Sequence, residues 1–229
     1  MPGVLPSPET PYGPLVLLRT RFVLTFTISK IFLDPAWYFY VFWFPEYFLR
    51  VRNFDLAAIG KYAWIPFAVA GAGNLLGGWL AAVLLRRNLG VSAVRKLCVA
   101  LFAGLMAAAI PAVFVANTAL AIAFVSLAMM GYTACSANML AIPADAFPTS
   151  AVGSVYGLAS MGSGFGGMVF ALLTGWAVDR FSYVPVFVAF GLIPLVCALI
   201  VWKPLGPIHP ATVQSQLLRS QGNTYASIR

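Results

Sequence analysis

The chain has 229 residues, of which 61% are hydrophobic and only 9% are charged, and its net charge is +8. A typical soluble domain is roughly 45–50% apolar and about 25% charged, so this chain has too few charged side chains to cover the exterior of a water-soluble globule. The composition excludes that class and makes lipid the solvent for most of the surface.

Six apolar runs along the chain are long enough to cross a bilayer. A membrane span needs roughly 20 mostly apolar residues at about 1.5 Å of rise per residue. The predicted spans cover residues 22–48, 56–85, 94–116, 119–142, 151–178 and 184–202. These runs are continuous and too long for barrel strands, which alternate over about ten residues. We therefore predict an all-α membrane protein with a six-helix unit over residues 21–203, a linker over 1–20 and a loose polar tail over 204–229.

The excess positive charge follows the alternation of the spans. Nine cations belong to one side if six helices alternate: Arg19, Arg21, Arg86, Arg87, Arg95, Lys96, Lys203, Arg219 and Arg229. Four belong to the other side: Arg50, Arg52, Lys61 and Arg180. Such a bias is typical of cytoplasmic loops, so we expect a multi-pass protein of the inner (plasma) membrane with both termini in the cytoplasm. The charge then reports topology, and we expect no nucleic-acid partner.

The first span carries two opposite charges and a proline near its middle. Lys30 and Asp34 are one helical turn apart, and Trp37 and Tyr38 continue the same face. A charge at the bilayer centre costs about 2.5–3.5 kcal/mol, which favours a functional role. Pro35 predicts a broken helix and a freed carbonyl one turn earlier, open to solvent or ligand, as in many transporter sites. The alternative is that the two charges neutralise each other and serve only the fold.

Polar residues in the fourth span form a second candidate group. Tyr132 and Ser136 lie one turn apart, and Asn138 adds an amide that both donates and accepts hydrogen bonds. Asn74 in the second span has a similar character. These side chains either bind a hydroxylated substrate or join helices together, and the sequence leaves both interpretations open.

Glycines four residues apart predict close contacts between helices. The pairs are Gly73 with Gly77 in the second span, and Gly153 with Gly157 and Gly162 with Gly166 in the fifth. The three cysteines lie in three different spans without metal-ligand or redox spacing, so we expect no metal and no cofactor. We also expect no enzyme, because the carboxylates outside the first span lie at predicted helix ends. One of them, Asp55, is suited to cap the helix that follows it.

Seven stretches resemble, in order, the C-terminal half of major facilitator superfamily transporters, and in particular hexuronate-type members of the anion:cation symporter family. They are K-x-x-x-D-P-x-W-x-F-Y at 30–40, FWFPEYF at 42–48, GGWL at 77–80, RRNLGVSAVRK at 86–96, SAN at 136–138, DAFPTSAVGSVYG at 145–157 and GGMVFALLTGWAVD at 166–179. The resemblance departs at residues 81–83, where two alanines and a valine stand in place of the polar and charged residues usual there.

The resemblance implies six of the twelve helices of a secondary transporter, with the substrate bound at mid-membrane between two halves. It implies that Lys30 pairs with the carboxylate of a sugar acid and that Asp34 either fixes the position of Lys30 or accepts hydrogen bonds from the sugar hydroxyls. It also implies that Trp37 and Tyr38 stack on the sugar. The implied function is proton-coupled symport of organic anions such as hexuronates or aldonates, with a separate N-terminal half or a second copy as partner. The alternative is a truncated, non-transporting membrane protein or an interaction partner.

Overall fold

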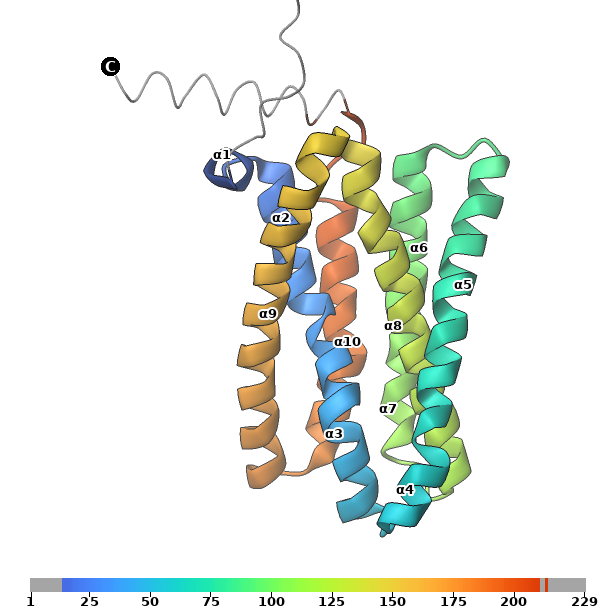
Figure 1. Cartoon of the computed structure of the whole chain (residues 1–229). Helices are drawn as coiled ribbons and strands as arrows, with labels where there is room; N and C mark the ends of the chain where they lie inside the picture. The colour runs from blue at the N-terminus through green and yellow to red at the C-terminus, as the bar shows by residue number, and fades with distance from the viewer. Residues whose placement is uncertain (1–13, 211–212, 214–229) are drawn as a thin grey trace, which may run out of the picture.

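The computed structural model describes residues 14–210 and 213, and all the regular elements within them are helical (Figure 1). The elements are α1 (Pro14–Leu18), α2 (Arg21–Leu33), α3 (Pro35–Val51), α4 (Leu56–Tyr62), α5 (Trp64–Arg86), α6 (Val91–Leu105), the 3-10 turn η1 (Met106–Ala108), α7 (Ala109–Ala112), α8 (Thr118–Ala146), α9 (Thr149–Arg180) and α10 (Tyr183–Trp202).

Five of the predicted spans appear as helical stretches long and apolar enough to cross a membrane. Among the described residues these are Leu56–Arg86, Val91–Ala112, Thr118–Ala146, Thr149–Arg180 and Tyr183–Trp202. The first predicted span is divided into α2 and α3, of 13 and 17 residues, at the position of Pro35. Counting that broken pair as one crossing, the predicted all-α, six-helix architecture is confirmed.

Prolines account for the interruptions within the spans. Proline has no backbone N–H, so it removes one bond of the helical ladder and its ring presses on the preceding turn. Pro35 begins α3, Pro66 lies in the first turn of α5, and Pro111 follows η1. Asp34 itself stays in the helical region with φ −71° and ψ −28°. A residue before proline is normally pushed out of the helical region, but Asp34 is not, so the break is a kink between two stacked helices.

The helices form two groups that meet mainly where α10 packs on α6, η1 and α7, and to a smaller extent where α8 contacts α9 and α3 (Figure 1). Helices α2, α3, α9 and α10 pack together on one side, while α5, α6 and α8 pack on the other. Aromatic rings fill the first group: Phe39 stacks on Phe190 with ring centroids 4.7 Å apart, and Tyr47 contacts Phe187 at 4.8 Å. The polar cluster described below lies where α3 faces α8.

Two of the three predicted glycine pairs bring helices into close contact. A β-carbon at Gly77 would lie 2.5 Å from the carbonyl oxygen of Ala134 on α8, and Gly73 faces the same helix one turn earlier. Gly162 and Gly166 pack in the same way against α2. Gly153 and Gly157 are exposed and meet no atom of this chain within 4 Å, so the predicted close contact is not made within the described residues.

Both ends of the six-helix unit are more ordered than the sequence suggested. The short helix α1 falls within the predicted linker, and its Leu17 is fully buried. Beyond α10, Leu205 and Ile208 are buried, and the Ile208 N–H donates to Ser92 Oγ at 3.1 Å. A loose tail is therefore wrong for residues 204–210, because apolar side chains fold back onto the bundle. Of the rest of the predicted linker and tail, the structure describes only residues 19–20 and 213, and Thr20 and Val213 are buried.

The end of the bundle opposite α1 is fixed by polar caps. Asp55 accepts a hydrogen bond from the Ala58 N–H at 2.7 Å, which confirms its predicted role as the cap of α4. Arg52 donates to the carbonyl oxygens of Ala112 (2.9 Å), the last residue of α7, and of Val115 (2.7 Å) and Ala116 (3.1 Å), which follow it. Since terminal carbonyls have no partners within their own helix, this arginine supplies them. It thereby ties the end of α3 to the α7–α8 connection.

Candidate functional site

A buried ion pair lies at the break between α2 and α3. Lys30 Nζ is 2.9 Å from Asp34 Oδ1 and 2.9 Å from Oδ2, and the two residues are only 7% and 6% exposed. The sequence spacing brings them together because residues four apart on a helix lie on the same face. The two charges therefore neutralise each other in this conformation, as one of the two sequence interpretations expected.

Aromatic side chains from three helices form a connected group beside this pair, and one of them bonds Asp34. The Tyr132 hydroxyl on α8 donates to Asp34 Oδ1 at 3.2 Å, so the carboxylate is bonded from two helices. Trp37 stacks on the Tyr132 ring with centroids 5.3 Å apart and an interplanar angle of 20°. Trp37 also packs edge-to-face against Phe67 of α5, with ring centroids 6.0 Å apart. The stack of Trp37 and Tyr132 thus joins the kinked helix to α5 and α8.

The members of this cluster differ in how far they reach the surface. Lys30, Asp34 and Tyr132 are buried, whereas Trp37 and Ser136 are half-buried. Ser136 follows Tyr132 by one turn of α8, which keeps both on one face of that helix. The outer part of the cluster is accordingly aromatic and hydroxylic, with the charges beneath it. Trp37 and Ser136 are therefore the members of the cluster that are most accessible from outside.

Tyr38 and Asn138 do not join this cluster. Tyr38 turns toward α9, where a β-carbon at Gly167 would lie 2.6 Å from its ring, and it stacks on Phe42. Asn138 is 1% exposed, and its amide nitrogen donates to the carbonyl oxygens of Gly77 (3.1 Å) and Ala134 (3.0 Å). The bond to Gly77 joins α8 to α5, whereas Ala134 lies one turn earlier on α8 itself. Asn74, the other amide singled out by the sequence, is exposed on α5.

The carbonyl freed by Pro35 is covered by a neighbouring helix. The Ile31 carbonyl oxygen would lie 2.7 Å from a β-carbon at Gly166 of α9, so the glycine allows the two backbones to approach closely at this point. The expectation that this oxygen is open to solvent or ligand is therefore wrong. The kink places its unpaired carbonyl against α9 and its charged side chains against α8.

A second polar cluster, of which the sequence singled out only Asn138 as a candidate site residue, lies toward the α1 end of the bundle. Arg95 of α6 donates through Nε to Asp145 Oδ2 of α8 at 2.7 Å and through Nη1 to Asn138 Oδ1 at 3.2 Å. With the Asn138 bond to Gly77, the cluster links α5, α6 and α8. Its partners are 43 and 50 residues apart in sequence, so no local pattern reveals the pairing. In the sequence, Arg95 and Asp145 are recognisable only as charged residues near the ends of predicted helices.

The arrangement suits the binding of an anion by exchange of partners. Lys30 is a cation held in a low-dielectric setting, and a buried charge is stable only when it is paired. Tyr132 and Ser136 are hydroxyls able to bond a polyhydroxylated ligand, and the Trp37 ring offers an apolar face. Among the described residues, no group of three or more His, Cys, Asp or Glu side chains is placed to hold a metal ion.

Comparison with known proteins gives a consistent result. The model of the Major Facilitator Superfamily matches residues 91–220, more than half of the chain. The chain is 29% identical over 191 residues to a protein of Escherichia coli K12 named "Hexuronate transporter", covering 82% of this chain and 44% of that protein. It is 28% identical over 189 residues to "Probable galactarate/D-glucarate transporter GarP" of the same organism, covering 81% and 42%.

A third relative is named for a smaller acid, sulfoacetate. "Probable sulfoacetate transporter SauU" of Cupriavidus necator is 30% identical over 143 residues, which cover 62% of this chain and 33% of the relative. In each comparison the chain spans less than half the length of the curated relative that it matches.

Proposed function

Because the chain belongs to the major facilitator superfamily, we propose that it forms the C-terminal half of a secondary transporter for sugar acids. The relatives are transporters, and the compounds in the names of the three described above are hexuronates, galactarate or D-glucarate, and sulfoacetate. All of these compounds carry at least one acidic group. The multi-pass helical architecture supports this proposal, and so does a buried lysine in a membrane-spanning unit.

The observation that carries the proposal is the buried Lys30–Asp34 pair beneath the Trp37–Tyr132 stack. In the substrate-free protein Asp34 is the counter-ion of Lys30. When the stack opens, the carboxylate of a sugar acid takes a place beside the Lys30 ammonium. The Tyr132 and Ser136 hydroxyls then bond the sugar hydroxyls, and Trp37 covers an apolar face of the ring.

Charge balance suggests how protons are coupled to the substrate. With the substrate bound, one ammonium would face two carboxylates, and an uncompensated buried charge costs several kcal/mol. A proton taken from solvent by an Asp34 carboxylate oxygen restores neutrality, since the protonated acid keeps one acceptor oxygen for the Tyr132 hydroxyl. Release of the substrate lets the proton leave and the Lys30–Asp34 pair form again. One proton therefore accompanies one monovalent anion.

The proposal includes a partner and an orientation. A transporter half needs a second half to close the substrate cavity, supplied either by a separate N-terminal half or by a second copy of this chain. The exposed small residues Gly153, Gly157 and Gly164 on α9 support close packing of another helix there. The distribution of cations supports cytoplasmic termini in the inner membrane.

Uptake by proteoliposomes tests this function. We expect labelled glucuronate to accumulate under an inward proton gradient when this chain is reconstituted with a co-expressed N-terminal half; accumulation by the chain reconstituted alone would instead make a second copy of it the partner. Lys30→Ala should raise the apparent substrate Kd at least tenfold, about 1.4 kcal/mol, whereas Lys203→Ala beyond α10 should leave it unchanged. An unchanged Kd for Lys30→Ala would mean that Lys30 stabilises the fold and does not bind the substrate. Absence of uptake with every partner would favour the non-transporting alternative.

A further inference from the structure

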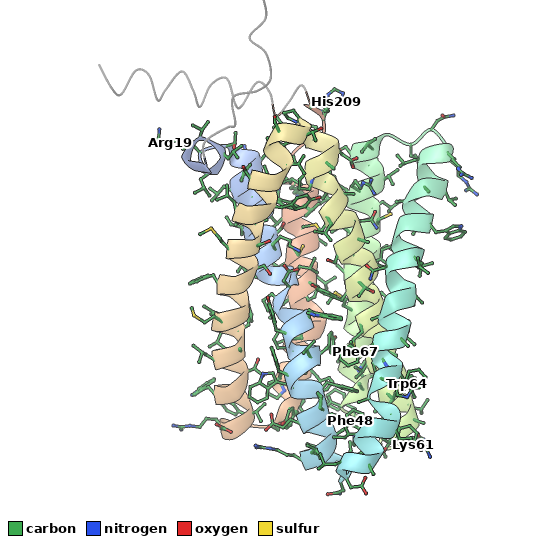
Figure 2. The ribbon with its side chains drawn as sticks, in the orientation of Figure 1. Arg19, Phe48, Lys61, Trp64, Phe67 and His209 are labelled. Atoms are coloured by element: carbon green, nitrogen blue, oxygen red, sulfur yellow. The ribbon has the colours of Figure 1, made fainter. Side chains whose placement is uncertain are left out.

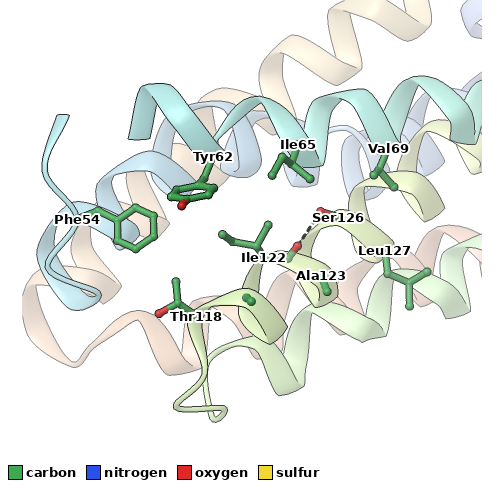
Figure 3. A pocket seen from close by; sticks show the side chains of 10 residues that line it. Phe54, Tyr62, Ile65, Val69, Thr118, Ile122, Ala123, Ser126 and Leu127 are labelled. Atoms are coloured by element: carbon green, nitrogen blue, oxygen red, sulfur yellow. Dashed lines mark hydrogen bonds between the residues drawn. The ribbon is translucent and has the colours of Figure 1, made fainter. Parts of the chain in front are cut away.

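An apolar groove of about 750 Å³ lies between α8 and the α4–α5 segment, at the end of the bundle opposite α1 (Figure 3). Tyr62, Ile65 and Val69 form one wall, and Ile122, Ala123 and Leu127 of α8 form the other. Ser126 also lines the groove, but its hydroxyl donates to the Ile122 carbonyl at 2.7 Å. The walls are therefore apolar, and the serine hydroxyl already has a partner.

The groove opens away from the Lys30 cluster. On α5, Phe67 points toward the cluster, where it contacts Trp37. Each residue turns a helix by about 100°, so Ile65 and Val69, two residues to either side of Phe67, point to roughly the opposite side. Helix α6 packs on α5 and α8 over the other part of the bundle, whereas α7 packs on α8 and α10. The groove remains where the third span leaves α5, on the side away from the substrate site.

A cation lies at one end of the groove. The Lys61 ammonium is 5.2 Å from the centre of the Tyr62 ring, and Tyr62 is part of the groove wall. Trp64 is 62% exposed next to it, and its indole N–H donates to the Lys61 carbonyl at 2.9 Å. Figure 2 shows both residues at the α4–α5 end of the bundle. Exposed tryptophan and lysine at a helix end are typical of the level of lipid headgroups.

We propose that this groove binds a phospholipid with an anionic headgroup, one acyl chain lying between α5 and α8 and the phosphate beside Lys61. A cavity with apolar walls in a membrane protein is filled by acyl chains, which regain the dispersion contacts that a void would lose. The ring of Tyr62 holds the ammonium at the mouth, where its charge attracts the anionic headgroup of a lipid. A helix of a transporter half fits less well, because the groove faces away from the substrate site.

Native mass spectrometry of the purified full chain, titrated in detergent with phosphatidylglycerol or phosphatidylcholine, tests the proposal. We expect one lipid to bind more tightly than the others and to prefer phosphatidylglycerol by roughly fivefold, the ratio for about 1 kcal/mol. Lys61→Gln should remove this preference and leave binding of phosphatidylcholine unchanged. Ala123→Phe, which fills the groove, should abolish the tight binding of both lipids.

Two controls separate the groove from the general lipid-facing surface. Ala82→Phe adds the same ring to an exposed position elsewhere on α5, and Lys203→Gln removes a cation beyond α10. Both should bind lipid as the unmodified chain does. Unchanged lipid binding by Ala123→Phe, or an equal loss in Ala82→Phe, would overturn the proposal. So would a disulfide cross-link from Ala123→Cys to a co-expressed N-terminal half without any retained lipid, because it would assign the groove to a protein helix.

Discussion

Removing the charges of Lys30 and Asp34 separately and together tests whether the two residues act as one unit. Both residues are less than a tenth exposed, and each Asp34 oxygen lies 2.9 Å from the Lys30 ammonium. Leaving one buried charge without its partner costs about 3–5 kcal/mol, whereas an apolar replacement of both charges is often close to neutral. We expect Lys30→Met and Asp34→Leu each to lower the free energy of unfolding by about 3–5 kcal/mol.

The double variant should recover most of that loss, because no unpaired charge remains. The assay is reversible unfolding of the purified chain in mixed micelles, and the coupling energy is the difference between the double variant and the sum of the single variants. Glu46 and Arg50 give a matched control, since they form an i,i+4 pair at 2.7 Å with side chains 30% and 61% exposed. That pair should couple by only about 0.3–0.5 kcal/mol. Additive losses at Lys30 and Asp34 would refute a buried, mutually compensated pair.

Three further predictions concern contacts between helices, each measured as the free energy of unfolding in the same micelles. Gly166→Ala should lower the free energy of unfolding by about 1–3 kcal/mol because the added methyl group meets the Ile31 carbonyl. Gly157→Ala adds a methyl group that meets no atom, so it should stabilise the chain by up to about 1 kcal/mol. Equal effects of the two substitutions would contradict the packing described. Arg52→Met should cost about 1–3 kcal/mol by leaving three carbonyls unbonded, and no loss would mean that water replaces the guanidinium. Asn138→Leu should cost about 1–3 kcal/mol without changing substrate Kd, and a tenfold weaker Kd would instead return this residue to the substrate site.

The sequence predicted the architecture well because its strongest signals are local. Continuous apolar runs specify membrane helices, and their bounds agree with the structure to within a few residues, as for the predicted span 184–202 and the helix Tyr183–Trp202. Pro35 marked the broken helix, and Asp55 marked a helix start, because both act through their own backbone neighbourhood. The glycine pairs are less specific, since spacing alone does not say whether the facing helix belongs to the same chain.

Contacts between distant segments could not be predicted from the sequence. Helical periodicity places Tyr38 on the same face as Lys30. In the structure its ring packs on α9 instead, because the glycine at position 167 leaves space for it. Arg95 was read as a topological charge, and its ion pair with Asp145 depends on how α6 meets α8. In each case the decisive partner lies on another helix, so composition and spacing could supply the residue but not its neighbour.

The pairing of Lys30 with Asp34 is compatible with a binding role, because a buried charge must have a counter-ion at every stage of a transport cycle. A lysine without a partner in the substrate-free protein would destabilise that state and would also favour the bound state so strongly that release became slow. Asp34 supplies a counter-ion that a substrate carboxylate can replace, and the bond from Tyr132 holds the aspartate in position during the exchange. The stable but uncharged double variant separates the two roles. It should fold and, reconstituted with an N-terminal half, transport no glucuronate; retained uptake would leave the pair with a structural role only.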